Sequence, residues 1–272
     1  MIPPSQRVSR LAFREGVFSE GQRAIPEETA LALVYDGGTQ AVMMATPADI
    51  ADFALGFSLT EGIIADPSDI TDFEIVEQAN GIEARMWLKP ERGQTLAARR
   101  RNLAGPTGCG LCGIDSLQEA LRAPRPVTSD LTVTPAEIEA ALASLAPAQA
   151  LNRETRAVHA AGFWTREQGL VALREDVGRH NALDKLAGTL AGTADISANG
   201  IIVLTSRISV ELIQKTAMIG APILVAVSAP TALALRLAEQ AGITLVGIAR
   251  GDGFEVFTHP QRLSPEPLSH VA

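Results

Sequence analysis

The chain has 272 residues, of which 46% are hydrophobic, and its formal net charge is −8. A chain of this length buries about three quarters of the surface that its unfolded form exposes, enough for one large domain or two modest ones. The acidic balance argues against binding to a nucleic-acid backbone. The most apolar run, Ile219–Ala229, is too short to cross a bilayer. Because the first residues also lack the pattern of a secretory signal, we expect a cytoplasmic protein.

The first half of the chain has the pattern of a small α+β unit. Residues 1–20 are polar and aperiodic, and we expect them to form a loose arm. Alternating apolar residues around Asp36-Gly37-Gly38 predict a hairpin over 28–44. Thr46 and Pro47 have the residue types of a helix cap and a first helical turn. The next predicted elements are a helix over 50–61 and strands over 72–78 and 82–88.

A glycine-rich segment and a proline-rich linker follow. We expect a mobile loop over about 95–113 and a helix over 115–121. The stretch Ala123-Pro124-Arg125-Pro126 is typical of a stiff linker. It divides the chain into a predicted N-terminal domain, residues 1–126, and a C-terminal domain, residues 127–272.

The second half alternates between strands and helices. A helix over 135–146 precedes a hairpin of 159–164 and 170–174 and a helix over 181–190. A β-α-β-α-β series then predicts a mainly parallel sheet with right-handed crossovers. Its expected elements are strands over 200–204, 223–227 and 243–248, helices over 209–219 and 231–241, and a closing antiparallel strand over 254–258.

Three loops of this half leave the carboxyl ends of consecutive predicted strands, at 205–207, 228–231 and 250–253. Open α/β sheets bind ligands at that edge. Two of the loops lead into helix N-termini, which favour anions, and Arg207 and Arg250 can add charge-assisted hydrogen bonds. A phosphorylated ligand and ordinary capped turns are both compatible with this pattern.

The stretch from Arg174 to Lys185 concentrates charged and ionisable residues at a strand-to-helix junction. This density suggests a site in which Arg179 or His180 faces a ligand. The alternative is that His180 is a hydrogen-bonded structural histidine, while Asp184 and Lys185 are solvated helix residues.

Both cysteines of the chain, Cys109 and Cys112, lie in one glycine-flanked C-x-x-C motif. In a reducing compartment such a pair is more often reactive or metal-binding than a structural disulfide. Three interpretations remain open from the residues: a persulfide carrier, a redox dithiol and a zinc site. A zinc deaminase is disfavoured, because Gly108 stands where its motif has proline and no histidine lies upstream.

Taken in order, these motifs resemble the formate dehydrogenase accessory sulfurtransferase family, FdhD. The resemblance covers nearly the whole chain. Its motifs lie at residues 46–47, 54–57, 60–64, 109–113, 159–161, 175–185, 206–209, 228–231 and 250–252.

The resemblance implies an N-terminal α+β domain followed by a cytidine-deaminase-like, three-layer α/β domain without the deaminase zinc site. Family members accept sulfur from a cysteine desulfurase and deliver it to the molybdenum of the bis-molybdopterin guanine dinucleotide cofactor for formate dehydrogenase. By resemblance, Cys109 carries the persulfide and Cys112 assists or resolves it. The implied cofactor-binding residues are Ile248, Ala249, Arg250, Gly251, Asp252 and Gly253, together with Arg207, Ser228, Arg179 and His180.

Two regions depart from the family pattern. Many members have phenylalanine at Ile248 and arginine at Gly253, and a glycine pair is common where this chain has Arg156-Ala157. From the resemblance as a whole, we expect a sulfurtransferase that forms a homodimer. We expect it to hold the molybdenum cofactor as a substrate and to bind no metal directly. Its expected partners are a cysteine desulfurase and formate dehydrogenase, with no nucleic acid or membrane. The rival interpretation is a non-enzymatic cofactor-binding chaperone whose cysteines form a zinc or dimer clip.

Overall fold

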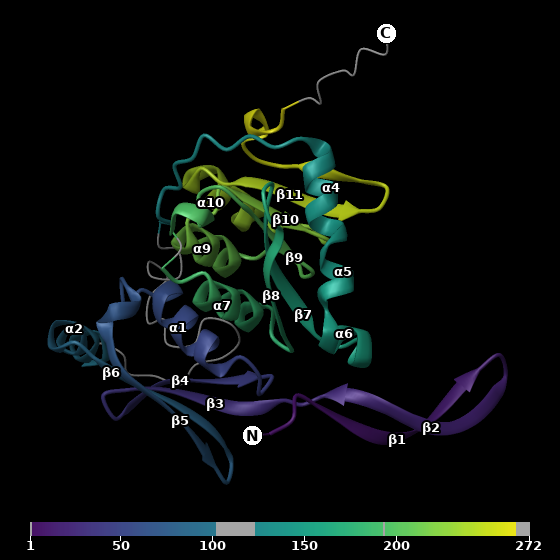
Figure 1. Cartoon of the computed structure of the whole chain (residues 1–272), viewed down its shortest axis with the longest axis horizontal. Helices are drawn as coiled ribbons and strands as arrows, with labels where there is room; N and C mark the ends of the chain where they lie inside the picture. Colours follow the sequence, from purple (N-terminus) through teal and green to yellow (C-terminus); the bar gives the residue numbers. More distant parts are fainter. Residues whose placement is uncertain (1, 102–122, 193, 265–272) are drawn as a thin grey trace.

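The computed structural model describes residues 2–101, 123–192 and 194–264. The fold is mixed α/β, with a six-stranded sheet, a four-stranded sheet and a separate two-stranded hairpin (Figure 1). Within the described ranges, no helix has both the length and the apolar character needed to span a bilayer. The predicted helix over 115–121, and both cysteines, lie outside the described residues.

The chain begins with a long hairpin, which corrects the expected loose arm. Strands β1 (Ser5–Arg14) and β2 (Val17–Pro26) pair antiparallel along their whole length. Glu15 and Gly16 make the turn with φ angles of 51° and 82°, the left-handed backbone conformation that tight hairpin turns require. Sequence reasoning missed this hairpin because its strands are rich in arginine and serine and bury little. We call β1 and β2 the arm.

The four-stranded sheet has the order β4-β3-β6-β5, and α1 and α2 contribute to a core on one of its faces. The predicted hairpin, helix and two strands of this region are confirmed. The predicted loop is wrong over residues 95–101, which continue α2 as far as Arg101. The bounds are β3 (Thr29–Tyr35), β4 (Gly38–Ala45), α1 (Ile50–Thr60), a 3-10 turn (Pro67–Asp69), β5 (Ile70–Gln78), β6 (Gly81–Leu88) and α2 (Pro90–Arg101).

The six-stranded sheet has the order β12-β11-β10-β9-β7-β8. Strands β9, β10 and β11 are mutually parallel, while β7, β8 and β12 join through antiparallel pairs, so the sheet is mixed. The bounds are α4 (Pro135–Ala143), α5 (Leu145–Ala148), α6 (Ala150–Thr155), β7 (His159–Thr165), β8 (Gly169–Asp176), α7 (Arg179–Thr189), α8 (Ala194–Ser197), β9 (Ile201–Leu204), α9 (Val210–Ile219), β10 (Ile223–Ala226), α10 (Ala232–Ala241), β11 (Thr244–Arg250), β12 (Gly253–Val256) and a 3-10 turn (Pro260–Arg262).

Helices cover both faces of this sheet, which gives three layers (Figure 1). One core lies between the sheet and α7, α9 and α10, and the other lies between the sheet and α4 with the start of α5. The strands of the parallel series are buried on both faces, as their continuous apolar runs predict. The likeness to cytidine deaminases and the domain boundary after residue 126 stay predictions.

The two sheets meet through helices α1 and α7, which pack backbone to backbone. A methyl group on Gly56 would lie 1.7 Å from the carbonyl oxygen of Asp184, and one on Gly188 would lie 1.9 Å from that of Asp52. Only glycine allows this approach. The contact fixes the start of α7 relative to the N-terminal sheet.

Buried ion pairs lie beside this α1–α7 interface. Lys185 and Asp176, both fully buried, pair at 2.7 Å, and the Lys185 ammonium also donates to the carbonyl of Thr46. Lys215 contacts Asp184 at 2.9 Å and Glu61 at 2.7 Å. Asp184 and Lys185 are therefore buried, and the alternative that they are solvated helix residues is wrong.

Burial alone would lower the pKa of Lys215, but the carboxylates of Asp184 and Glu61 outweigh it and raise that pKa above its ordinary value. The ammonium therefore stays charged between the two structural units. Thr46, expected as a helix cap, instead joins the units. Its N–H donates to Asp176, its hydroxyl accepts from the N–H of Val177, and Asp49 occupies the cap position of α1.

Candidate anion-binding rim

The loops that follow β9, β10 and β11 meet at one edge of the six-stranded sheet, as the parallel order predicts. The end of β8 reaches the same edge, because β8 is antiparallel to β7 and β7 is antiparallel to β9. We call this region the carboxyl rim: residues 205–209, 227–231 and 248–253, together with the start of α7 at Arg179 and His180.

Backbone hydrogen bonds join the three loops into one surface. Ile208 donates to Ala229 at 3.4 Å, and Thr231 donates back to Ile208 at 3.0 Å. The N–H of Ile248 donates to the carbonyl of Ser228 at 3.3 Å. Arg207, Ser228 and the 248–253 loop, which were predicted from separate motifs, therefore belong to one continuous region.

The 248–253 loop is set by an irregularity in β11. The pairing of β11 with β12 shifts register between Gly247 and Arg250, and Ile248 lies at φ 52° in the left-handed region. Such bulges redirect side chains at strand ends. The bend leaves Arg250 exposed and turns Ala249 into the core, where it is 1% exposed.

The rest of this loop is open. Gly251 and Asp252 are exposed, and Gly253 has a φ of 137°. A side chain at position 253 would be strained in this conformation, so glycine suits the bend that this chain has. Of the predicted loop residues, Arg250 and Asp252 present charged groups. A ligand contact by Ala249 would have to use its backbone.

The start of α7 is held by Asp176, the last residue of β8. One carboxylate oxygen of Asp176 accepts from the N–H of Gly178 at 2.7 Å and from the Asn181 amide at 2.9 Å. Its other oxygen accepts from Lys185. Both oxygens of the Asp176 carboxylate thus have partners. Arg179 and His180, the next residues but two and three along the chain, lie at the rim.

Arg179 has an unfilled hydrogen-bonding group. Its Nε–H is buried and has no partner among the described residues. An unpaired buried donor is unfavourable and is uncommon in folded proteins. Together with Arg207 and Arg250, Arg179 gives the rim three guanidinium groups, which suit phosphate oxygens.

His180 bridges α7 to α9. Its Nε2 atom lies 3.4 Å from the hydroxyl of Ser209 and 3.7 Å from a carboxylate oxygen of Glu211. The interaction with His180, aided by Ser209, holds the pKa of Glu211 at about 2, well below its ordinary 4.5. The Glu211 carboxylate therefore remains ionised and fixes His180 beside the 205–209 loop.

His159, at the start of β7, was not among the predicted site residues. It is half-buried, and its cross-strand neighbour is Asp176. Burial, and next the positive charge of Arg179, lower the pKa of His159 below its ordinary 6.5. The register of the predicted hairpin could have revealed this residue, because it sets His159 beside the strand end that leads into α7.

No group of three or more potential metal ligands (His, Cys, Asp or Glu) occurs in residues 2–101, 123–192 and 194–264. The predicted catalytic residues Cys109 and Cys112 lie outside these ranges, so their placement stays a prediction.

The fold and the rim define a mixed α/β protein whose carboxyl rim carries three arginines. The chain belongs to the FdhD/NarQ family, whose model matches residues 26–264. This membership confirms the resemblance of the motifs.

Two relatives illustrate the match, and both are named sulfur carrier protein FdhD. The chain is 53% identical to that of Agrobacterium fabrum over 259 residues, 95% of this chain and 96% of the relative. It is 50% identical to that of Cupriavidus necator over 266 residues, 97% of this chain and 92% of the relative. A crystal structure of a candidate formate dehydrogenase accessory protein from Desulfotalea psychrophila aligns with a TM-score of 0.73 and 26% identity, covering 96% of this chain and 100% of that one.

Proposed function

We propose that this chain is a cytoplasmic sulfurtransferase that serves formate dehydrogenase maturation. It takes persulfide sulfur from a cysteine desulfurase and passes it to the molybdenum of the bis-molybdopterin guanine dinucleotide cofactor, which it binds as a substrate. The observation that carries the proposal is about half identity over nearly the full chain to proteins named sulfur carriers. The confinement of all cysteine to one motif supports it.

The first chemical step is a thiol–persulfide exchange. The Cys109 thiolate attacks the outer sulfur of the donor persulfide, a new S–S bond forms on Cys109, and the donor leaves as a thiolate. The exchange needs no external oxidant or reductant, because one S–S bond replaces another.

The second step releases sulfur at the oxidation level of sulfide. The Cys112 thiolate attacks the inner sulfur of the Cys109 persulfide, which forms a disulfide and releases hydrosulfide as a ligand for the cofactor's molybdenum. Cys112 supplies the two electrons that reduce the outer sulfur. A thiol reductant then restores the dithiol for the next cycle.

The carboxyl rim is our candidate for the site that holds the cofactor. Its guanine dinucleotide arms carry phosphates, and Arg179, Arg207 and Arg250 offer guanidinium groups for them. The unpaired buried Nε–H of Arg179 is the strongest support, because a phosphate oxygen would supply the missing acceptor. Ser228 and His180 lie on the same surface, as the hydrogen bonds above show. We also propose that the chain forms a homodimer and that this homodimer binds the cysteine desulfurase and formate dehydrogenase.

Mass spectrometry tests the sulfur step. After incubation with a cysteine desulfurase and cysteine, we expect one added sulfur atom on Cys109. The Cys109→Ser variant should lose the adduct, whereas Cys112→Ser should retain the persulfide and fail to release hydrosulfide. Stoichiometric zinc with no sulfur adduct would overturn the proposal in favour of the chaperone with a cysteine clip.

Guanosine diphosphate binding, measured by calorimetry, tests the rim. Arg207→Gln and Arg250→Gln should each weaken binding by about tenfold or more, the scale of one charge-assisted hydrogen bond. Arg125→Gln is the matched control, because Arg125 is exposed near Val127, whose N–H donates to Ala241 at the opposite edge of the sheet. Equal binding by all three variants would remove the rim from the proposal.

A further inference from the structure

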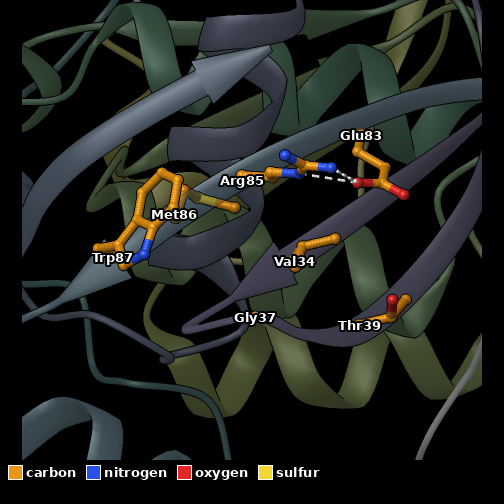
Figure 2. A pocket seen from close by; sticks show the side chains of 7 residues that line it. All are labelled: Val34, Gly37, Thr39, Glu83, Arg85, Met86 and Trp87. Carbon is orange, nitrogen blue, oxygen red and sulfur yellow. Dashed lines mark hydrogen bonds and ion pairs between the residues drawn. The ribbon is translucent and has the colours of Figure 1, made fainter. Parts of the chain in front are cut away.

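The first turn of α7 carries the unfilled donor of the carboxyl rim. Arg179 keeps its Nε–H buried and without a partner among the described residues. Arg85 has the more usual arrangement: Figure 2 shows it in a hollow on the four-stranded sheet, where its Nε–H donates to Glu83 at 2.8 Å. An unmade buried hydrogen bond costs about 1–3 kcal/mol, so a side chain that is free to turn finds an acceptor. The place of Arg179 must therefore be set by the backbone that carries it.

The turn over residues 176–178, which leads into α7, is held by a residue of the four-stranded sheet. The hydroxyl of Thr46, directly after β4, accepts from the N–H of Val177 at 3.1 Å. The N–H of Thr46 donates to the carboxylate of Asp176 at 3.0 Å, and the same carboxylate accepts from the N–H of Gly178 at 2.7 Å. Thr46 and Asp176 are both 0% exposed. Two consecutive N–H groups of the turn therefore have buried side-chain acceptors, one of them supplied by the four-stranded sheet.

Asn181, in the first turn of α7, makes a second connection to the end of β4. Its buried side-chain amide donates to the carbonyl of Met44 at 2.8 Å and to the carboxylate of Asp176 at 2.9 Å. The amide also packs on the backbone directly before Arg179, because a methyl group on Gly178 would lie 2.8 Å from the amide nitrogen. The Asn181 side chain therefore cannot rotate without losing two buried hydrogen bonds.

These contacts explain how Arg179 is kept with an unfilled donor. We call Thr46, Asp176 and Asn181 the turn clamp. Each hydrogen bond of the turn clamp contributes on the order of 1 kcal/mol, so several of them together offset the cost of one unpaired donor. A binding group that is already held in place loses less conformational freedom when its ligand arrives, and this raises the affinity.

We infer that Asn181 and Thr46 are positioning residues for the anion site: through the turn clamp they hold the Arg179 guanidinium at the carboxyl rim, ready to donate to a phosphate oxygen. The end of β4 thereby takes part in ligand binding without contacting the ligand. This inference rests on the proposed function, because it needs an anion at the rim. It adds to that function the part played by the four-stranded sheet.

A double-mutant cycle on guanosine diphosphate binding tests the positioning role. Arg179→Gln should weaken binding by about tenfold, and Asn181→Ala by up to the same factor. The combined variant should bind no more weakly than Arg179→Gln alone, because Asn181 acts through Arg179. Ser58→Ala is the matched control: it removes a buried hydroxyl that contacts Tyr35 and donates to the carbonyl of Ala54 in the core of the four-stranded sheet. It should keep the wild-type affinity even where it lowers the free energy of unfolding.

A pair of substitutions at Thr46 separates positioning from folding. Thr46→Val removes the hydroxyl with little change of shape and should weaken nucleotide binding, whereas Thr46→Ser keeps the hydroxyl and should retain the affinity. In the protein without nucleotide, Asn181→Ala and Thr46→Val should both raise the pKa of His159, because the positive charge of Arg179 that lowers it is no longer held nearby. Thr46→Ser and Ser58→Ala should leave this pKa at its wild-type value.

The outcomes separate this inference from the proposed function. Additive losses of affinity in the double variant, or an unchanged His159 pKa in folded Asn181→Ala, would overturn the positioning role while leaving the nucleotide at the rim. A wild-type protein that binds no guanosine diphosphate would overturn the rim and the positioning role together, and the sulfur-adduct measurement would still stand.

Discussion

The two parts of the charged segment 174–185 are used in opposite ways. In the α1–α7 interface, Lys185 and Asp184 are buried and each is paired with an opposite charge. At the carboxyl rim, Arg179 has a buried donor without a described partner, and His180 makes only long contacts. Satisfied buried charges fix a structure, whereas unsatisfied ones are candidates for binding a ligand. The comparison separates the residues that hold α7 in place from the residues that α7 contributes to the carboxyl rim.

The largest expected effect lies in the α1–α7 interface. Lys185→Met should lower the free energy of unfolding by about 3–5 kcal/mol, because it leaves the Asp176 carboxylate buried without its cation. Lys89→Met should cost under about 1 kcal/mol, since Lys89 makes only partly exposed contacts with Asp69 and Ser68. Urea unfolding of the two variants measures the difference. Equal losses would mean that burial of the Lys185–Asp176 pair adds nothing to stability beyond what an exposed pair contributes.

Close packing of the same helices gives the next effect. Gly188→Ala should cost about 1–3 kcal/mol, because its methyl group would meet the backbone of Asp52 and force the helices apart. Gly251→Ala is the control at the rim, where an added Cβ meets no atom within 4 Å. Its unfolding free energy should change by less than about 0.5 kcal/mol. If Gly188→Ala were equally neutral, the backbone contact of α1 and α7 would be wrong.

Titration at the rim should show the opposite behaviour, with small effects on stability and clear effects on charge. The pKa of Glu211, at about 2 in the folded protein, should rise toward 4.5 in His180→Gln. Because the folded-state pKa is depressed, the stabilisation is complete above pH 4.5 and is lost as the pH falls toward 2.

Glu137 provides the control within the same protein. Its pKa is also about 2, chiefly because Arg166 donates to it, and it should not respond to His180→Gln. Side-chain carboxyl NMR follows both groups at once. An unchanged Glu211 would show that His180 does not set its charge.

The sequence predicted the second half of the fold better than the first, for a physical reason. Buried runs such as Ile223–Ala226 follow from hydrophobic pattern alone, and the parallel order then brought Arg207, Ser228 and Arg250 to one edge, as expected. The arm carries no such pattern, because its strands lie mostly in solvent.

The sequence pattern also could not predict which residues of the 174–185 segment are buried and which lie at the carboxyl rim. Whether Lys185 is solvated or buried depends on α1, which precedes it by more than a hundred residues and reaches it only because Gly56 and Gly188 allow contact. The left-handed bend at Ile248 depends likewise on a register shift that no local propensity encodes. Long-range packing decided both features.

The smallest effect is also the most specific for the rim. His159 should titrate below 6.5, and Arg179→Gln should raise its pKa, because Arg179 is the second cause of the depression after burial. Guanosine diphosphate should raise the same pKa in the wild-type protein, since phosphate beside Arg179 offsets the positive charge that disfavours protonation of His159. Imidazole proton NMR with and without the nucleotide measures both shifts.

The Arg125→Gln variant, altered at the opposite edge of the sheet, should show the wild-type response of His159 to the nucleotide. A His159 titration that ignores the nucleotide, in a protein that binds it, would place the phosphates away from Arg179. The unpaired Nε–H would then need another acceptor, and the rim would retain only Arg207 and Arg250 as anion-binding groups. His159 thus reports which part of the carboxyl rim the ligand occupies, even though its own contribution to binding is small.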